Sequence, residues 1–452
     1  MKIVIVGAGS TVFTSGLIAD LTGSALFADA TVALVDINPR SAETMARYAE
    51  RVARERGVGL QVEFATDRRE VLSGADFVTV TIAVGGARAW ERDVRIPEAH
   101  GVYQTVGDSV GPGGVFRALR HVPELVAIAR DMEALCPDAW LFNYTNPLTA
   151  LVRAIHKSSS IKCAGLCHGV LHTRGAIAHD LGLAPAELSL TAAGVNHLAW
   201  VLDLRHAGQD VYPRYRDLVR GWLSSAPPPY DDPYEGFQEV SARLMELYGY
   251  YPSPGDRHVA EFFPFFLRQT GDGLGYGLQS GLDMTNDILA SRDERWDHIV
   301  DQAEGRAELD RALFDEAREG ERVVSIMQAI VMNRPLLELA VNVRNDGLIP
   351  NLPTEAVVEV PGLVDGRGVH GIAVGALPEG IAGILAARVR QQELTVDAAL
   401  AGDWARALQA LLADPLVPSV EMAEGMLDQA LEAHAPYLPR FAGTIPGPVL
   451  SH

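Results

Sequence analysis

Short apolar runs alternate with helical patterns along the first third of the chain. The first run covers residues 2–6 and ends in Gly7-Ala8-Gly9-Ser10, after which apolar positions recur with helical spacing over about 13–21. Further runs occupy 31–35, 61–64, 77–82, 140–143 and 161–166, with a helix predicted over 39–56. Because these runs are continuous, they are typical of strands covered on both faces, and their alternation with helices predicts a mostly parallel, doubly wound α/β sheet.

The pattern changes after about residue 168. Strands are predicted at 188–193 and 199–204, on either side of Gly194-Val195-Asn196-His197. We expect helix over 213–250, interrupted by three prolines at 227–229, then a turn-rich loop at 252–255 and mostly helix over 287–339. A strand near 357–360 precedes helices over 380–434. The sequence therefore predicts a Rossmann-type domain over 1–168 and an α+β domain over 169–452.

Bulk composition narrows the class of protein. The 452 residues are 48% hydrophobic and carry a formal net charge of -20, which disfavours nucleic acid as a partner and by itself indicates only solubility. Cys136, Cys163 and Cys167 are too few for a disulfide framework and fit a reducing compartment. No leader precedes the first strand, and no apolar run approaches the roughly 20 residues of a membrane span. We therefore expect a cytoplasmic protein without a membrane partner.

The glycines after the first strand predict a dinucleotide site. Gly7 and Gly9 allow the backbone to approach a pyrophosphate at a helix N-terminus, and Asp36 ends the second strand, where a carboxylate binds the ribose of NAD and repels the extra phosphate of NADP. The third glycine of the fingerprint is replaced by Val12, so a glycine turn in another kind of α/β protein stays an alternative. We also assign cofactor binding to the neighbouring Ser10 and Thr11.

Two further segments are candidates for the nicotinamide side of that site. Val84-Gly85-Gly86 follows the strand at 77–82, and glycines at such a strand end can line the cofactor or simply form a turn. Asn143 ends the strand at 140–143. We assign Gly85 and Asn143 to cofactor binding.

Polar clusters stand at three predicted strand ends, at 143–147, 167–169 and 196–197. A thiolate from Cys167 and an imidazole from His197 can bind a divalent transition ion and leave coordination positions open for substrate. Taken alone, Cys167 is also compatible with a small buried hydrophobe and His197 with a hydrogen-bonded structural histidine.

Two other segments carry candidate chemistry. In Gly255-Asp256-Arg257-His258, followed by Glu261, titratable residues crowd a loop, either as an acid/base or anion-binding cluster or as a helix start capped by Asp256 with Glu261 on a solvated face. Residues 106–114 contain too many glycines for a helix or strand and predict a loop that brings backbone close to a ligand.

These motifs together resemble glycoside hydrolase family 4, the NAD- and metal-dependent glycosidases. The segments VGAGS, GDSVGPGG, NYTNP, GLCHG and GVNHLAW occur in the family's order, followed by NDGLIPNLP at 345–353 and VEVP at 358–361. The resemblance covers nearly the whole chain, and the ordered set is more specific than any single motif. It implies the lactate/malate dehydrogenase-like fold and a homodimer or homotetramer.

The resemblance also implies a glycosidase that works by elimination. NAD⁺ takes a hydride from C3 of the sugar, a base removes the acidified C2 proton, and Mn²⁺ or another divalent ion acts as Lewis acid. The glycosidic oxygen leaves with help from an acid, water adds, and NADH returns the hydride. The partner is thus a small carbohydrate.

Site residues follow from the matching motifs. Cys167 and His197 match the metal ligands, Asn146 matches a substrate-binding asparagine, and His168 occupies a position used for acid catalysis or sugar recognition. Cys167-His168-Gly169 is similar to the members that act on α-linked uronic acids, so we expect an α-glucuronidase or α-galacturonidase. A substrate carboxylate needs a cation. Substrate contacts are assigned to Asn196, Arg88 and Arg257, with His258 and Arg117 as further cations.

One departure from the family concerns the base. Many members use a tyrosine where this chain has Phe262-Phe263, which cannot take a proton. Asp256, His258 or Tyr103 would then serve as the base. The same mechanism on a neutral α-glucoside or α-galactoside, a simple NAD-dependent dehydrogenase and a non-catalytic binding protein remain as alternatives.

Overall fold

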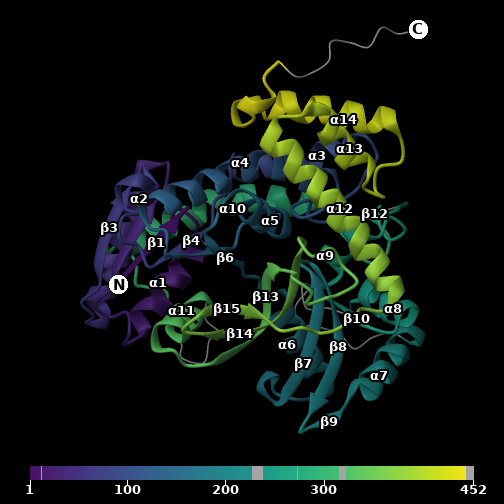
Figure 1. The fold of residues 1–452 in the computed structure, drawn as a ribbon, viewed down its shortest axis with the longest axis horizontal. Coiled ribbons are helices and arrows are strands. Elements are labelled where there is room, and N and C mark those ends of the chain that lie inside the picture. Colours follow the sequence, from purple (N-terminus) through teal and green to yellow (C-terminus); the bar gives the residue numbers. More distant parts are fainter. Residues whose placement is uncertain (12, 226–237, 272, 315–321, 444–452) are drawn as a thin grey trace.

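The computed structural model describes residues 1–11, 13–225, 238–271, 273–314 and 322–443 (Figure 1). Its first part contains six parallel strands in the order β3-β2-β1-β4-β5-β6. They are β1 (Lys2–Val6), β2 (Thr31–Val35), β3 (Gln61–Ala65), β4 (Phe77–Val80), β5 (Trp140–Asn143) and β6 (Lys162–Gly165). This order reverses between β1 and β4, which confirms the predicted Rossmann-type sheet and places the ligand crevice at the carboxyl ends of these two strands.

The helices between these strands are α1 (Phe13–Gly23), α2 (Pro39–Arg56), α3 (Gly86–Ala99), α4 (Gly111–Leu135) and α5 (Leu148–Ser158), and α6 (Gly169–Leu181) follows β6. Their ends follow local chemistry. The Asn38 side chain accepts a hydrogen bond from Arg40 N and Pro39 begins α2, while Gly57 ends it at φ 67°.

The second half of the chain extends the same sheet instead of building a separate one. Strand β13 (Leu336–Arg344) pairs antiparallel with β6 through a single pair, Asn342 with Gly165. Strand β14 (Val357–Asp365) pairs with β13 and meets β7 through Glu359 and Gly194. The sheet continues through β7 (Leu188–Val195), β8 (Leu198–His206) and β10 (Tyr251–Ser253), with β9 (Gln209–Asp210) and β15 (Gly368–Gly371) at its edges. The result is a 13-stranded sheet.

Two predictions of local structure were wrong. Residues 336–339, expected to be helical, belong to β13, because Pro335 stops α11 (Arg322–Met332) and pairing with β14 then holds the apolar run extended. Residues 111–114, expected to be loop, begin α4. A Cβ on Gly113 would lie 2.7 Å from Gly107 O, and one on Gly114 2.6 Å from Ser109 C, so these glycines serve close packing of the loop on the helix start.

The remaining helices are α7 (Tyr212–Ser224), α8 (Glu239–Tyr248), α9 (Asp256–Val259), α10 (Gly281–Ala303), α12 (Glu379–Ala401), α13 (Trp404–Leu412) and α14 (Val420–Ala433). The proline interruption at 227–229 lies outside the described residues. The turn predicted at 252–255 overlaps β10 and holds a cis Ser253–Pro254 bond. Among the described helices, none has the length and apolarity to cross a bilayer.

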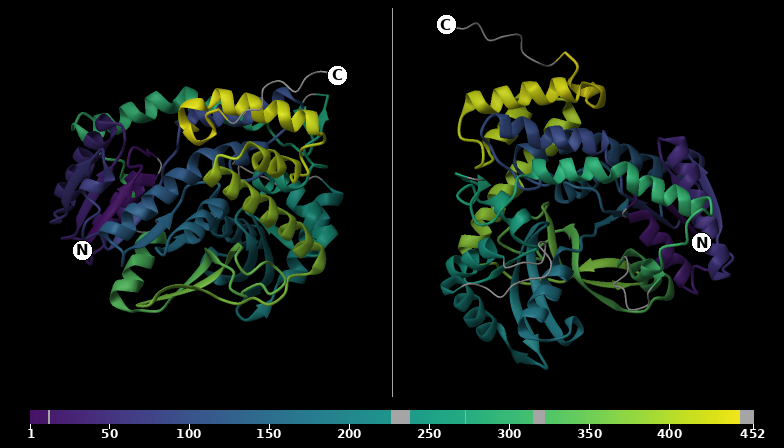
Figure 2. Two further views of the ribbon diagram at one scale, coloured as in Figure 1. Left: turned by 45° about the horizontal axis from the view of Figure 1, so that its top comes forward. Right: turned by 180° about the vertical axis from the view of Figure 1, so that it is seen from behind.

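The C-terminal helices return to the first part of the molecule. Figures 1 and 2 show α14 (yellow) above the helices of the first part of the chain; α14 packs on α3, while α12 and α13 pack on α4. Helix α10 packs on α2 and α3 as well. Because helices that follow residue 168 pack on helices that precede it, the domain boundary predicted at residue 168 stays a prediction.

Candidate functional site

The glycine turn lies at the reversal point of the strand order. Gly7 has φ 94°, and a Cβ there would lie 2.8 Å from Ile82 N, so only glycine fits. Asp36 Oδ2 accepts a hydrogen bond from Gly9 N (2.8 Å), which fastens the turn to the end of β2. The arrangement places the glycine turn and one carboxylate at the edge where a dinucleotide binds in such sheets.

The other predicted cofactor residues lie near this turn or at the next strand ends. Ser10 Oγ accepts from Phe13 N (3.3 Å), and Thr11 O accepts from the Ser15 hydroxyl. Val12 lies outside the described residues. Gly85 has φ 82° and precedes α3. The Asn143 side chain is buried and bonds both backbone groups of Thr145, so it shapes its own turn.

Cys167 and His197, expected to bind metal, are brought together. Cys167 follows β6, whereas His197 sits in the two-residue turn between β7 and β8 with φ 66°. Positive φ is unusual for a bulky residue and costs on the order of 1–3 kcal/mol, which points to a functional constraint. Cys167 Sγ lies 3.6 Å from His197 Nε2.

A buried relay fixes the imidazole. His197 Nδ1 lies 2.7 Å from Ser109 Oγ, and that hydroxyl donates to Asp108 Oδ1 (2.6 Å). Since the hydroxyl proton is used on the carboxylate, Ser109 accepts from Nδ1–H, which leaves the Nε2 lone pair facing Cys167. Asn146 Nδ2 donates to the other Asp108 oxygen (2.8 Å), so the predicted substrate asparagine joins the same cluster.

These residues fit a metal ion. Burial lowers the pKa of His197 to about 3, which keeps the imidazole neutral and its lone pair available. Burial, with Glu359 nearby, raises the pKa of Cys167 to about 12, so only a cation would make it a thiolate. The 3.6 Å between Cys167 Sγ and His197 Nε2 would allow both atoms to hold one divalent transition ion.

His258 adjoins this pair, and a second grouping of ligands includes it. Its ring centroid lies 3.9 Å from that of His197, and its buried Nδ1 makes no hydrogen bond with any described residue. Asp108, His197 and His258 each offer one ligand atom within 4.8 Å of the others. Because Ser109 occupies His197 Nδ1, we favour Nε2 and Cys167 as the ligand pair and treat His258 as a neighbour. Burial lowers the pKa of His258, so its imidazole is neutral.

Asp256 and Glu261 are structural in their contacts. Asp256 accepts from Val240 N (2.7 Å) and from Ser241 N and Oγ (2.8 and 2.7 Å), so it caps α8. It does not cap its own helix, whose N-cap is Gly255. The alternative that placed Glu261 on a solvated face is wrong: the residue is fully buried, and its Oε1 accepts from Val106 N and Gly107 N (2.8 and 2.7 Å).

Asn196 precedes His197 in the turn and bonds inward. Its Nδ2 donates to Glu359 Oε2 (3.1 Å), which also accepts from Asn342 Nδ2 (2.8 Å). The Asn196 Oδ1 is buried without a hydrogen-bond partner among the described residues. Its amide thus has one atom in use and one available.

The predicted cations differ in position. Arg117 is 9% exposed; its Nε donates to Asn146 O (3.0 Å), its guanidinium lies 5.1 Å from the Trp90 ring centroid, and no described carboxylate forms an ion pair with it. Arg257 bonds Thr105 O through Nη2 (3.4 Å). Arg88 lies exposed on α3. Tyr103 makes no hydrogen bond with any described residue, and no contact links it to the cluster.

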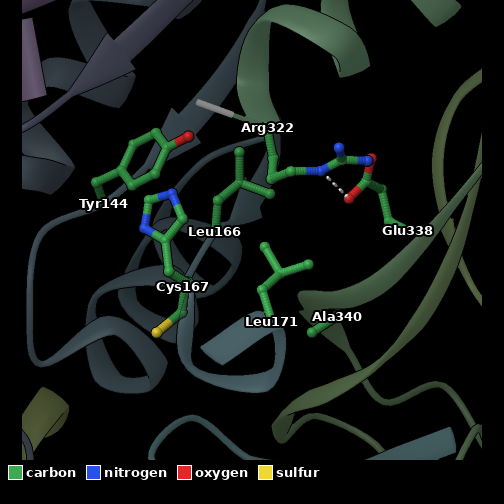
Figure 3. Close-up of a pocket in the computed structure, with 8 residues that line it drawn as sticks. Tyr144, Leu166, Cys167, Leu171, Arg322, Glu338 and Ala340 are labelled. Atoms are coloured by element: carbon green, nitrogen blue, oxygen red, sulfur yellow. Dashed lines mark hydrogen bonds and ion pairs between the residues drawn. The ribbon is translucent and has the colours of Figure 1, made fainter. Parts of the chain in front are cut away.

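A pocket opens beside Cys167 and His168 (Figure 3). The Tyr144 and His168 rings stack along one side, 6.1 Å between centroids. Across the pocket, Arg322 forms a bidentate ion pair with Glu338, which is 2% exposed. The pocket therefore pairs an aromatic wall with a charged one; its lining is completed by Leu166, Leu171 and Ala340.

Several residues of the site had no assigned role in the sequence prediction, among them Asp108, Ser109, Arg322 and Glu338. Asp108 and Ser109 stood inside the loop at 106–114, and polar side chains between glycines were the signal available for them. Arg322 and Glu338 gave no signal, since one begins a helix and the other lies in a strand predicted as helix.

Comparison with known proteins gives the family. The model "Family 4 glycosyl hydrolase" matches residues 2–183, and "Family 4 glycosyl hydrolase C-terminal domain" matches 192–417. The α-galactosidase of Bacillus subtilis is 32% identical over 444 residues, covering 97% of this chain and 99% of that protein. The α-galacturonidase of Bacillus subtilis is 32% identical over 436 residues, covering 92% and 93%.

Solved structures agree with the fold. The Bacillus subtilis lplD structure superposes with a TM-score of 0.84 at 31% identity, covering 95% of this chain and 99% of that one. A 6-phospho-α-glucosidase from gut microorganisms, solved with NAD and Mn²⁺, gives 0.81 at 21% identity, covering 97% and 99%. Malate dehydrogenase of Plasmodium falciparum gives 0.52 at 13% identity, covering 91% and 99%, which confirms the dehydrogenase-like fold.

Proposed function

Because this chain belongs to the family 4 glycosyl hydrolases, we propose that it cleaves the α-glycosidic bond of a uronic acid with NAD⁺ and a divalent ion such as Mn²⁺. The observation that carries the proposal is the 3.6 Å separation of Cys167 Sγ and His197 Nε2. Cys167 follows β6 at the sheet edge where the glycine turn follows β1, and His197 meets it there from the turn between β7 and β8. A structural neighbour that binds NAD and Mn²⁺ supports both cofactors.

The two cofactors supply chemistry that no side chain offers. When bound, NAD⁺ accepts a hydride from C3 and returns it later, while the ion withdraws electrons from the sugar oxygens beside C2. Cys167 and His197 would hold the ion, and Ser109 with Asp108 holds the imidazole in the tautomer this requires.

Proton transfer falls to histidines in this proposal. His258 takes the C2 proton, because it is neutral, buried against His197, and has a ring nitrogen without a protein partner among the described residues. Asp256 is bound to α8, and no hydrogen bond or ring contact joins Tyr103 to a described residue of the cluster, so neither is proposed further. His168 lines the pocket next to Cys167 and assists the leaving oxygen. Asn146, bonded to Asp108, contacts a sugar hydroxyl.

The uronide preference rests on the Cys167-His168-Gly169 pattern, on the α-galacturonidase relative and on two cations. Arg117 is buried beside Asn146, and Asp108 and Asp93 act on its charge without forming an ion pair with it in the described part of the chain, so its guanidinium can pair with a substrate carboxylate. Arg322 lines the pocket with His168, but Glu338 already balances its charge. We therefore favour Arg117 as the carboxylate contact.

A panel of aryl α-glycosides, charged and neutral, tests the proposal in the presence of Mn²⁺, NAD⁺ and thiol. We expect hydrolysis of α-glucuronides or α-galacturonides only when all three are present, and product formed in D₂O with deuterium at C2. Retention of the C2 proton would contradict the elimination mechanism. Cleavage of neutral galactosides alone would replace the substrate class, and NADH accumulating in step with product would favour a dehydrogenase. A requirement for reduced Cys167 would fit the expected cytoplasmic location. The expected homodimer or homotetramer stays a prediction.

A further inference from the structure

The segment after the family-model match makes contact with the cofactor side of the molecule. The match to the C-terminal domain ends at residue 417, yet α14 and the short helix η5 (Ala435–Tyr437) follow it and pack on the first part of the chain (Figure 2). We propose that residues 433–437, from the end of α14 through η5, support the loop 81–86 of the NAD⁺ site, with Tyr437 as the residue that positions it. The inference rests on the proposed use of NAD⁺.

The loop 81–86 lies directly against the glycine turn. Thr81 Oγ1 donates to Gly7 O (3.0 Å), and a Cβ on Gly7 would lie 2.8 Å from Ile82 N. On its other side, Thr145 Oγ1 donates to Ile82 O (3.1 Å). The loop therefore joins the carboxyl ends of β1, β4 and β5, and any shift in it changes the floor of the crevice where a dinucleotide lies.

A neutral histidine holds the middle of the loop from below. His121 Nδ1 donates to Arg117 O (2.8 Å), so its Nε2 carries the lone pair and accepts from Val84 N (3.0 Å). Burial lowers the pKa of His121 well below its ordinary value, which keeps this arrangement in the neutral form. The neighbouring Arg120 Nε lies 3.4 Å from Val84 O.

The C-terminal segment is anchored to the same network. Arg120 and Asp93 form a fully buried bidentate pair, with both bonds at 2.6 Å, and His434 Nε2 lies 3.0 Å from Asp93 Oδ1. Arg92 Nη1 donates to Ala433 O (2.8 Å). The end of α14 is thus fixed by α3, the helix that begins directly after the loop.

Tyr437 completes the support from above. A Cβ on Gly85 would lie 3.0 Å from Cε2 of Tyr437, so the ring packs on the bare backbone of the loop, at a residue with φ 82°. Tyr437 is 41% exposed, so removing its ring leaves the core intact. Loss of the ring should widen the range of loop conformations and weaken cofactor binding without touching the metal ligands.

The experiment is an NAD⁺ titration of the full chain by calorimetry, without substrate, for wild type and for Tyr437→Ala, Tyr437→Phe and Val420→Ala. Val420 is the control, because it begins α14, at the opposite end of that helix from Ala433, and is 48% exposed. We expect Tyr437→Ala to raise the Kd for NAD⁺ about three- to thirtyfold, with Tyr437→Phe and Val420→Ala close to wild type.

A second measurement separates positioning from general damage. Co²⁺ binding, followed by the absorption of its bond to the Cys167 thiolate, should be the same in Tyr437→Ala as in wild type. An unchanged Kd for NAD⁺ in Tyr437→Ala, or an equal loss of Co²⁺ and NAD⁺ binding, overturns the inference. If wild type itself binds no NAD⁺, the proposed function fails, which is a different result from a variant that matches a binding-competent wild type.

Discussion

Replacement of Ser109 by alanine tests the relay that orients His197. Ser109 Oγ stands 2.7 Å from His197 Nδ1, whereas the nearest other acceptor, Asp108 Oδ1, is 3.9 Å from that nitrogen. The variant therefore leaves a ring N–H without a partner at hydrogen-bond distance, in a residue only 5% exposed. A buried donor left unpaired costs about 1–3 kcal/mol, and the ring becomes free to turn its Nε2 away from Cys167.

The loss of metal affinity in Ser109→Ala depends on the difference between the cost of the unpaired N–H in the metal-bound protein and its cost in the metal-free protein. Removal of an outer partner of a metal-binding histidine lowers metal affinity by about 10–100-fold, which corresponds to about 1.4–2.7 kcal/mol. This range lies within the cost of the unpaired donor, so we expect Ser109→Ala to bind Mn²⁺ or Co²⁺ about 10–100-fold more weakly.

The assay is a Co²⁺ titration with NAD⁺ present, read from the thiolate absorption. Ser109→Thr keeps the hydroxyl and is the matched control, expected near wild type, while Cys167→Ser should lose the thiolate absorption. Thermal melts of each variant show whether the fold is retained. If Ser109→Ala binds Co²⁺ within twofold of wild type, the assigned tautomer and the role of the relay are both refuted.

Three further predictions concern the cofactor turn and a buried acid. Asp36→Ala should weaken NAD⁺ binding about tenfold and reduce the preference over NADP⁺, as measured by titration with both; an unchanged preference would contradict the assigned role. Gly7→Ala should abolish NAD⁺ binding and lower the melting temperature, because its Cβ would lie 2.8 Å from Thr81 C and Ile82 N; a stable variant that binds NAD⁺ would refute this. Burial raises the pKa of Glu261 to about 8 from 4.5, so the folded chain holds that proton more tightly and its free energy of unfolding falls as pH rises across this range. Glu261→Gln should remove this dependence, so the melting temperature of the variant minus that of wild type should increase as pH rises; the same difference at every pH would contradict the prediction.

The first part of the fold was predictable because its determinants are local. Strands β1 and β2 are nearly continuous apolar runs, whereas β3 at the sheet edge alternates and is largely exposed, so the expectation that every run is covered on both faces was wrong for β3. The turn after β1 contains two glycines directly after an apolar run, which is a signal visible in the sequence. Asp36 likewise ends β2 where the fold requires it. The pairing of Cys167 with His197 came from family motifs, since nothing in their spacing indicates that β6 and the β7–β8 turn end beside each other.

Other features depend on contacts between distant parts of the chain. Leu336 to Arg344 is a strand because β14 and β6 pair with it, which no propensity reveals. The ring of His197 is oriented by Ser109 from a loop far away in sequence. Asp256 looked like the cap of its own helix but caps α8, because only the folded chain brings those two segments together. Such residues are chosen by tertiary geometry, which the pattern of polar and apolar positions does not encode.

Strand pairing in the large sheet is reduced to one residue pair at two places, where β6 meets β13 and where β14 meets β7. The Glu359 carboxylate accepts hydrogen bonds from Asn342 on one side and Asn196 on the other. A single side chain thus links the strands at both places, beside the thiol and the imidazole. Changes in the strands and helices on either side of Glu359 can therefore leave the spacing of Cys167 and His197, the proposed metal ligands, unchanged. A fold with this arrangement can change its substrate preference through those strands and helices while the residues around Cys167 and His197 stay the same.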